Sequence, residues 1–295
     1  MQPATQDRIG KSQNASARER LISALPVTER RLTLNGVSTA VLEGGRGQPI
    51  VLLHGPAAYG AIWMDAISAL VKTHRVIAPD LPGHGASAVF EGPPTPERVA
   101  GWLDDLIECT CSKPPVLVGA TLGGAIAARF ATDGVRPLAA LVLVDALGLA
   151  EFRPAPALGE ALQSFLQSPT SATLDGLWGQ CVHDLDGVRQ RLGEQWQWIK
   201  AYGLAGIQLA GTDGLMGWLH EHAMHAIPDS MLERIRTPTT LIWGRHDPAT
   251  PLAAAEQIQR RFGWRLEVIE EAGDAPAIEK PEAFLGALHR AIGVP

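Results

Sequence analysis

Val116–Gly124 reads Val-Leu-Val-Gly-Ala-Thr-Leu-Gly-Gly, and this stretch decides how the rest of the chain can be arranged. Its short apolar, β-branched start predicts a buried strand, and the following Ala-Ile-Ala-Ala-Arg-Phe favours a helix. Gly119 and Gly123 flank a tight turn and allow the strand and helix to pack closely. The turn carries one hydroxyl, that of Thr121. A β-branched residue is unfavourable where a tight turn requires positive φ, so a threonine here is unexpected.

Alternating strand and helix patterns surround this stretch. The runs Arg30–Leu34 and Val37–Glu43, joined by Asn35-Gly36, predict a hairpin with a two-residue turn. Thr95 is the expected N-cap of a helix with proline at its first position. The alternation predicts an α/β fold, a mainly parallel twisted sheet with helices on both faces. The other expected strands are Pro49–Leu53, Arg75–Ala78, Leu141–Val144, Thr239–Trp243 and Arg265–Ile269; the other expected helices are Ile62–Val71, Pro251–Phe262 and Pro281–Ile292.

The strand pattern stops after residue 149 and resumes at residue 237. Between these points we expect short amphipathic helices, which form a cap above the carboxyl ends of the strands, where such sheets bind ligands. The predicted division is an N-terminal extension (1–27), a core (28–149 and 237–295) and a helical cap or lid (150–236).

Composition narrows the function classes. The net charge is −6 and the pI is near 5.8, so no nucleic-acid partner is expected. No run of about 18 apolar residues is present to span a membrane. The three cysteines Cys109, Cys111 and Cys181 fit a reducing compartment, and no signal peptide is evident, so we expect a cytoplasmic protein. The oligomeric state is left open.

Several landmarks in order resemble the α/β-hydrolase superfamily, within the capped bacterial subgroup of esterases, meta-cleavage C–C hydrolases and haloperoxidase-like proteins. The resemblance covers residues 28–293, and Gly119-Ala-Thr-Leu-Gly123 matches the superfamily's nucleophile elbow Gly-x-Ser-x-Gly with threonine at its centre. The other landmarks are His54-Gly55, Trp63, Asp80-Leu-Pro-Gly-His-Gly-Ala-Ser87, Leu141–Asp145 and Leu241-Ile-Trp-Gly-Arg-His-Asp-Pro-Ala-Thr-Pro251.

The resemblance implies three catalytic positions. Thr121 stands at the nucleophile position and Asp247 at the acid position. Asp274, in the turn Glu271–Pro276, occupies the slot of the usual catalytic histidine. An ordinary aspartate, with a pKa near 3.9, is a weaker base for an alcohol than histidine. Burial beside Asp247 is expected to raise the pKa of Asp274 and make it a usable acid or base.

The resemblance also implies an oxyanion hole made of backbone N–H groups. Leu122, after the nucleophile position, can donate. Pro56, directly after His54-Gly55, has no N–H, which leaves Ala57 as the other candidate donor if the loop shifts. Together with Thr121 and Asp274, Pro56 is a third departure from the superfamily's pattern at one site.

The remaining histidines offer alternatives. His54 and His84 are expected to shape loops, and His246 to point away. A histidine of the cap could replace the missing base: His183, His220, His222 or His225. Asp145 could act as an auxiliary acid. The HExxH zinc motif would need histidine at position 224, where methionine stands, so no metal and no cofactor are expected.

These residues predict an enzyme of hydrolase descent, acting on a small, largely apolar ester, ketone or related carbonyl compound through a Thr/Asp/Asp site. A catalytically silent ligand-binding protein remains an alternative, and so does a non-hydrolytic lyase or isomerase that uses the carboxyl groups for acid–base chemistry. All three would bind a small apolar molecule.

Overall fold

The computed structural model describes residues 17–134 and 136–293, so most of the predicted N-terminal extension lies outside the described residues. Within these ranges the strands form one eight-stranded sheet in the order β1-β2-β4-β3-β5-β6-β7-β8. The predicted hairpin β1–β2 is antiparallel, as is the pairing of β2 with β4, and every later pair is parallel. The strands are β1 (Thr28–Leu34), β2 (Val37–Gly44), β3 (Gln48–Leu53), β4 (His74–Pro79), β5 (Val116–Ala120), β6 (Ala140–Val144), β7 (Thr239–Gly244) and β8 (Arg265–Ile269).

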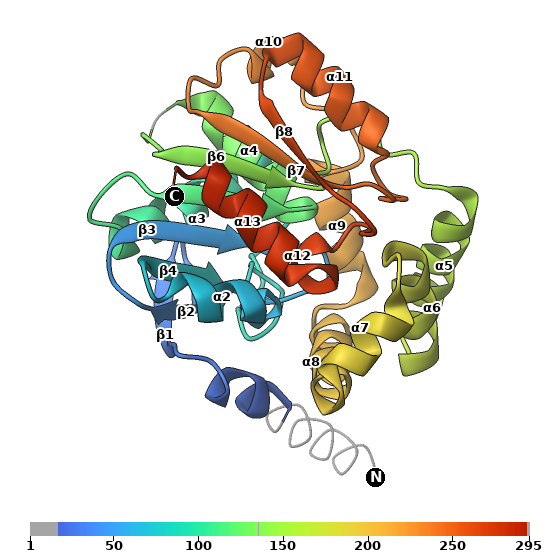
Figure 1. Cartoon of the computed structure of the whole chain (residues 1–295). Helices are drawn as coiled ribbons and strands as arrows, with labels where there is room; N and C mark the ends of the chain where they lie inside the picture. Colours follow the sequence, from blue (N-terminus) through green and yellow to red (C-terminus); the bar gives the residue numbers. More distant parts are fainter. Residues whose placement is uncertain (1–16, 135, 294–295) are drawn as a thin grey trace.

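Helices cover both faces of the sheet, as predicted (Figure 1). Leu117 and Leu143 of the central strands pack with α3, α4 and α11, whereas Val118 and Val142 pack with α2 and α13 on the opposite face. Alternate strand residues therefore enter two different cores, as the two-residue period of a strand requires. The core helices are η1 (Gly60–Trp63), α2 (Met64–Leu70), α3 (Pro96–Thr110), α4 (Leu122–Asp133), α11 (Leu252–Phe262), α12 (Pro276–Glu279) and α13 (Pro281–Ala291).

The chain between β6 and β7 forms helices, which we call the helical insert. Figure 1 shows these helices beside the sheet, with α5 and α6 packed on each other and α8 leading into α9. The insert consists of α5 (Pro156–Gln167), α6 (Ser171–Cys181), α7 (Leu185–Leu192), α8 (Glu194–Ala210), α9 (Thr212–His222) and α10 (Asp229–Leu232).

One local expectation, the side-chain cap of α3, needs adjustment. Thr95 does precede α3, but its side chain accepts no capping hydrogen bond, and α3 continues to Thr110. Residues 17–23, inside the predicted extension, are helical. Among the helices that the structure describes, none is both long and apolar enough to cross a bilayer.

Candidate active site

Thr121 lies in the sharp turn between β5 and α4. Its backbone adopts φ 46° and ψ −108°, a conformation that costs a β-branched residue of the order of 1–3 kcal/mol. The surrounding contacts hold it there, because its N–H donates to Val144 (2.9 Å) and its carbonyl accepts from Ala125 and Leu147 (both 3.1 Å). A Cβ at Gly119 would collide with the carbonyl of Gly123. The turn between β5 and α4 therefore holds Thr121 in a strained conformation.

The hydroxyl of Thr121 lies against the backbone after β3. A Cβ on Gly55 would collide with Thr121 Oγ1, so glycine is required there for the hydroxyl to keep its place. This contact joins two predicted parts of the site, the elbow and the His54-Gly55 loop.

Both Thr121 and Asp274 line one cavity of about 210 Å³, which we call the site cavity. Its walls come from the core loops and from α5, α6, α8 and α9 of the helical insert. Its polar lining is sparse, and the apolar part includes Trp63, Val144, Leu147, Phe152, Leu158, Leu162, Phe165, Leu174, Leu177, Trp178, Ile199, Leu215 and Leu219. An apolar cavity with a few polar groups is typical of a small-molecule site.

Asp274 follows β8, in the turn that docks against the end of α6. Its N–H donates to the carbonyl of Cys181 (3.1 Å), and the Cys181 thiol donates to its carboxylate. The surface that Asp274 leaves accessible faces the site cavity. Desolvation is the main cause that raises its pKa to about 7, with the charge of Glu279 adding to it and the thiol opposing it.

Asp247 lies behind Asp274 and is not part of the cavity lining. It is buried, and Oδ1 accepts the N–H groups of Ala249 (2.7 Å) and Thr250 (2.9 Å). Oδ2 has no hydrogen-bond partner in the described part of the chain. Burial raises the pKa of Asp247, and the charge of Asp274 raises it further. A histidine at 274 would be able to donate to this oxygen, whereas an ionised aspartate cannot.

Two further carboxyl groups adjoin this pair. Asp145 accepts the N–H of Gly244 (2.7 Å) through Oδ1, and burial followed by the charge of Asp247 raises its pKa. Glu279, in α12, accepts the N–H groups of Gly273 (2.8 Å) and His183 (2.7 Å). Burial raises the pKa of Glu279 in spite of these bonds. Glu279 therefore ties the Asp274 turn to the insert, a role that the sequence analysis did not assign.

The predicted oxyanion donors come from two segments, the start of α4 and the loop after β3, of which only the loop contributes its predicted residues to the cavity lining. Leu122 is the first residue of α4, so its N–H has no partner within the helix. Pro56 lines the cavity and has no N–H to offer. Ala57 also lines the cavity and has φ 59°, a strained value for a residue other than glycine.

The structure places none of the insert histidines in the lining of the site cavity. His183 stacks on His246 with ring centres 4.1 Å apart, and His222 bonds to the carbonyl of Pro94 (2.7 Å). His225 is exposed beside Glu151 (3.6 Å), and His220 lies edge-on to His225. The alternative of a replacement base from the insert therefore finds no candidate.

His54 does line the cavity, but both of its ring nitrogens are occupied. Nε2 accepts the N–H of Leu81 (2.9 Å), and Nδ1 bonds to the carbonyl of Gly55 (2.8 Å). Burial lowers its pKa to about 4. His54 thus shapes the loop, as predicted. Across the described ranges no group of three or more His, Cys, Asp or Glu side chains is placed to hold a metal ion.

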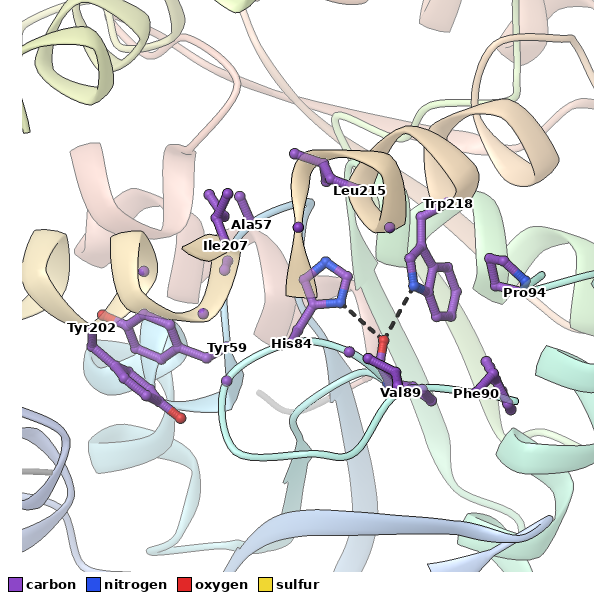
Figure 2. Close-up of a pocket in the computed structure, with 18 of the residues that line it drawn as sticks. Ala57, Tyr59, His84, Val89, Phe90, Pro94, Tyr202, Ile207, Leu215 and Trp218 are labelled. Carbon is purple, nitrogen blue, oxygen red and sulfur yellow. Dashed lines mark hydrogen bonds between the residues drawn. The ribbon is translucent and has the colours of Figure 1, made fainter. Parts of the chain in front are cut away.

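A second pocket, also of about 210 Å³, adjoins the site cavity (Figure 2). Figure 2 shows His84 and the Trp218 indole directed at one oxygen, the carbonyl of Pro82, at 3.2 and 3.1 Å. Ala57 and Tyr59 belong to both linings, so the loop after β3 forms the shared wall. Neither Thr121 nor Asp274 reaches this second pocket.

Comparison with known proteins shows the family to which the chain belongs. A family model described as Alpha/beta hydrolase family matches residues 50–287. The chain belongs to this family. The pimeloyl-[acyl-carrier protein] methyl ester esterase of Neisseria meningitidis serogroup C is 31% identical over 251 residues, covering 82% of this chain and 91% of that protein.

More distant members of the family include other hydrolases. The 2-hydroxy-6-oxo-6-(2'-aminophenyl)hexa-2,4-dienoic acid hydrolase of Metapseudomonas resinovorans is 26% identical, covering 88% of this chain and 89% of that protein. A carboxylesterase of Bacillus subtilis superposes with a TM-score of 0.80 at 17% identity, covering 95% of this chain and 97% of that chain. At this identity the structural likeness concerns the fold, an α/β-hydrolase fold as predicted.

Proposed function

We propose that this α/β-hydrolase family member is an enzyme that hydrolyses a small, largely apolar ester or related carbonyl compound at Thr121. The observation that carries the proposal is that Thr121 and Asp274 line one apolar cavity, with Asp274 poised at a pKa of about 7. Relatives that act on a methyl ester and on a dienoic acid support a carbonyl substrate. Three free cysteines support a cytoplasmic location.

In this proposal the Asp274 carboxylate accepts the proton of the Thr121 hydroxyl while Oγ1 attacks the carbonyl carbon. The C–O bond of the ester then breaks, and protonated Asp274 returns the proton to the departing alcohol. Water, deprotonated by the same carboxylate, attacks the carbonyl carbon of the acyl-threonine. The bond between that carbon and Oγ1 breaks, the acid is released, and Asp274 returns the proton to Oγ1. Asp247 is buried, and the charge of Asp274 raises the pKa of Asp247 further, so ionised Asp274 favours a proton on Asp247.

The N–H of Leu122 stabilises the developing oxyanion. Pro56 supplies no second donor, and the loss of one such donor typically lowers the rate by about 10²–10³. We therefore propose a slow enzyme compared with serine hydrolases, whose substrate is held mainly by the apolar walls of the cavity.

The test measures turnover of a panel of short alkyl esters by the wild type, Thr121→Ala and Asp274→Asn, with the exposed Asp186→Asn as a matched control. We expect slow hydrolysis by the wild type and the control, and none above background by the two site variants. Pro56→Ala, which restores an N–H, is expected to raise the rate. Equal rates in wild type and Thr121→Ala would refute the proposal. Ligand binding without turnover of any ester would instead favour a silent binding protein.

A further inference from the structure

The site cavity contains a charged side chain that the proposed chemistry does not use. Lys200, on α8, lines the cavity, and its side chain is only 9% exposed. A lysine is seldom buried this deeply unless it is paired. The remaining lining is apolar apart from the Thr121 and Asp274 region and a few other polar groups, so Lys200 places a positive charge in a largely apolar wall.

The carboxylate that pairs with Lys200 is shared with a second cation. Its Nζ donates to Asp175 Oδ2 (2.7 Å) and approaches Ser171 Oγ (3.3 Å). Asp175 also accepts from Arg189 through Oδ1 (3.1 Å), so two cations share one carboxylate. The other carboxylate near Arg189, Asp186, is 93% exposed and contributes little inside the wall. Among the described contacts, the third N–H of the ammonium has no acceptor.

One helix, α6, runs from the Asp274 end of the cavity to the Lys200 end. Cys181, at the carboxyl end of α6, contacts Asp274, whereas Ser171 and Asp175 of the same helix contact Lys200. At 1.5 Å per residue, the six to ten residues between these contacts separate the two regions by roughly 9–15 Å. Between them α6 contributes Leu174, Leu177 and Trp178 to the lining.

We propose that Lys200 binds the carboxylate of an amphiphilic substrate whose apolar chain lies along α6 and whose reacting carbonyl lies at Thr121. The substrate class is then an ester or ketone with a free carboxylate at the far end of an apolar chain. This inference rests on the proposed function for the reacting end, but the binding of the carboxylate does not depend on turnover.

The experiment compares octanoate with octan-1-ol, which has the same chain length and no charge, by titration calorimetry. The wild type is expected to prefer octanoate. Lys200→Met is expected to weaken the binding of octanoate by roughly ten- to hundredfold, the range for a hydrogen bond to a charged group. The affinity for octan-1-ol should stay nearly unchanged. Lys200→Arg should retain the preference, and the exposed Lys113→Met is the matched control for net charge.

Asp175→Asn gives a second, opposite test, because it removes the carboxylate that competes for Lys200. It should strengthen octanoate binding, and it decides the question alone if Lys200→Met does not fold. The proposal is overturned if both ligands weaken equally in Lys200→Met, if Asp175→Asn weakens octanoate, or if the wild type shows no preference. Thr121→Ala should keep the preference, so loss of turnover and loss of carboxylate binding are distinguishable.

Discussion

Replacing Asp274 by asparagine is expected to stabilise the fold, and to do so more strongly at high pH. In the folded protein the pKa of Asp274 is raised from 3.8 to about 7, chiefly because desolvation penalises the charged carboxylate. The folded state therefore holds a proton more tightly than the unfolded chain does. Folding stability is highest where both states are protonated, below the unfolded pKa, and falls as the pH rises through the folded pKa.

The size of the effect follows from the shift of about three units. At 1.36 kcal/mol per unit, the ionised carboxylate of Asp274 costs the folded state at most about 4 kcal/mol above pH 8. Near pH 5 the cost is about 2 kcal/mol, because the folded protein must hold a proton that the unfolded chain has released. Asparagine never carries this charge, so the penalty disappears in the variant.

Urea unfolding of wild type and Asp274→Asn near pH 5 and pH 8.5 tests this reasoning. The free energy of unfolding of the variant should exceed that of the wild type by a margin that grows by about 2–3 kcal/mol between the two pH values. The exposed Asp186→Asn should show no such trend. The reasoning would be refuted if the difference in unfolding free energy were the same at both pH values, or if the variant were less stable than wild type at the higher pH. Either result would show that Asp274 is not a buried carboxyl group with a raised pKa.

Two further outcomes concern turnover. Gly55→Ala should lower kcat by about 10² or more, because the added Cβ would displace Thr121 Oγ1. Gly159→Ala, where a Cβ meets nothing within 4 Å, should leave kcat unchanged. Equal kcat values in the two variants would contradict the position of the Thr121 hydroxyl. The rate should rise with pH through about 7 as Asp274 ionises. Cys181→Ala removes the thiol that stabilises the carboxylate and should move the midpoint of this rise up by about one pH unit, whereas Cys181→Ser should not move it. A midpoint unmoved by Cys181→Ala would exclude Asp274 as the titrating base.

The fold could be predicted because its signals are local. The apolar run before Thr121, the Asn35-Gly36 turn and the alternation of strands with helices each depend on neighbours in the sequence. The sheet order follows once these elements belong to a doubly wound fold. Thr121 and Asp274 could be located because each occupies a position fixed by a strand end.

The rest of the site could not be predicted, because it depends on how the helical insert docks. Cys181 contacts Asp274, and Glu279 accepts the N–H of His183, which lies 96 positions earlier in the sequence. No local sequence pattern indicates either contact. Lys200 was missed for the same reason, since a lysine on an amphipathic helix is usually solvated. The segment Pro276–Phe284 has two carboxylates, Glu279 and Glu282, and nothing in the local sequence distinguishes the one that is buried.

In the proposed site, an aspartate at the position expected for histidine changes more than the strength of the base. An imidazole can donate to Asp247 through one nitrogen and accept from the nucleophile through the other, so it satisfies both neighbours at once. A carboxylate only accepts, and Asp247 Oδ2 is left without a partner unless a proton is present. Burial raises the pKa values of Asp145, Asp247 and Asp274, and the charge of Asp274 raises those of the other two further, which favours such a proton near neutral pH. The same proton that satisfies the buried oxygens must leave Asp274 before it can act as a base, so in this site stability at neutral pH and catalytic readiness oppose each other.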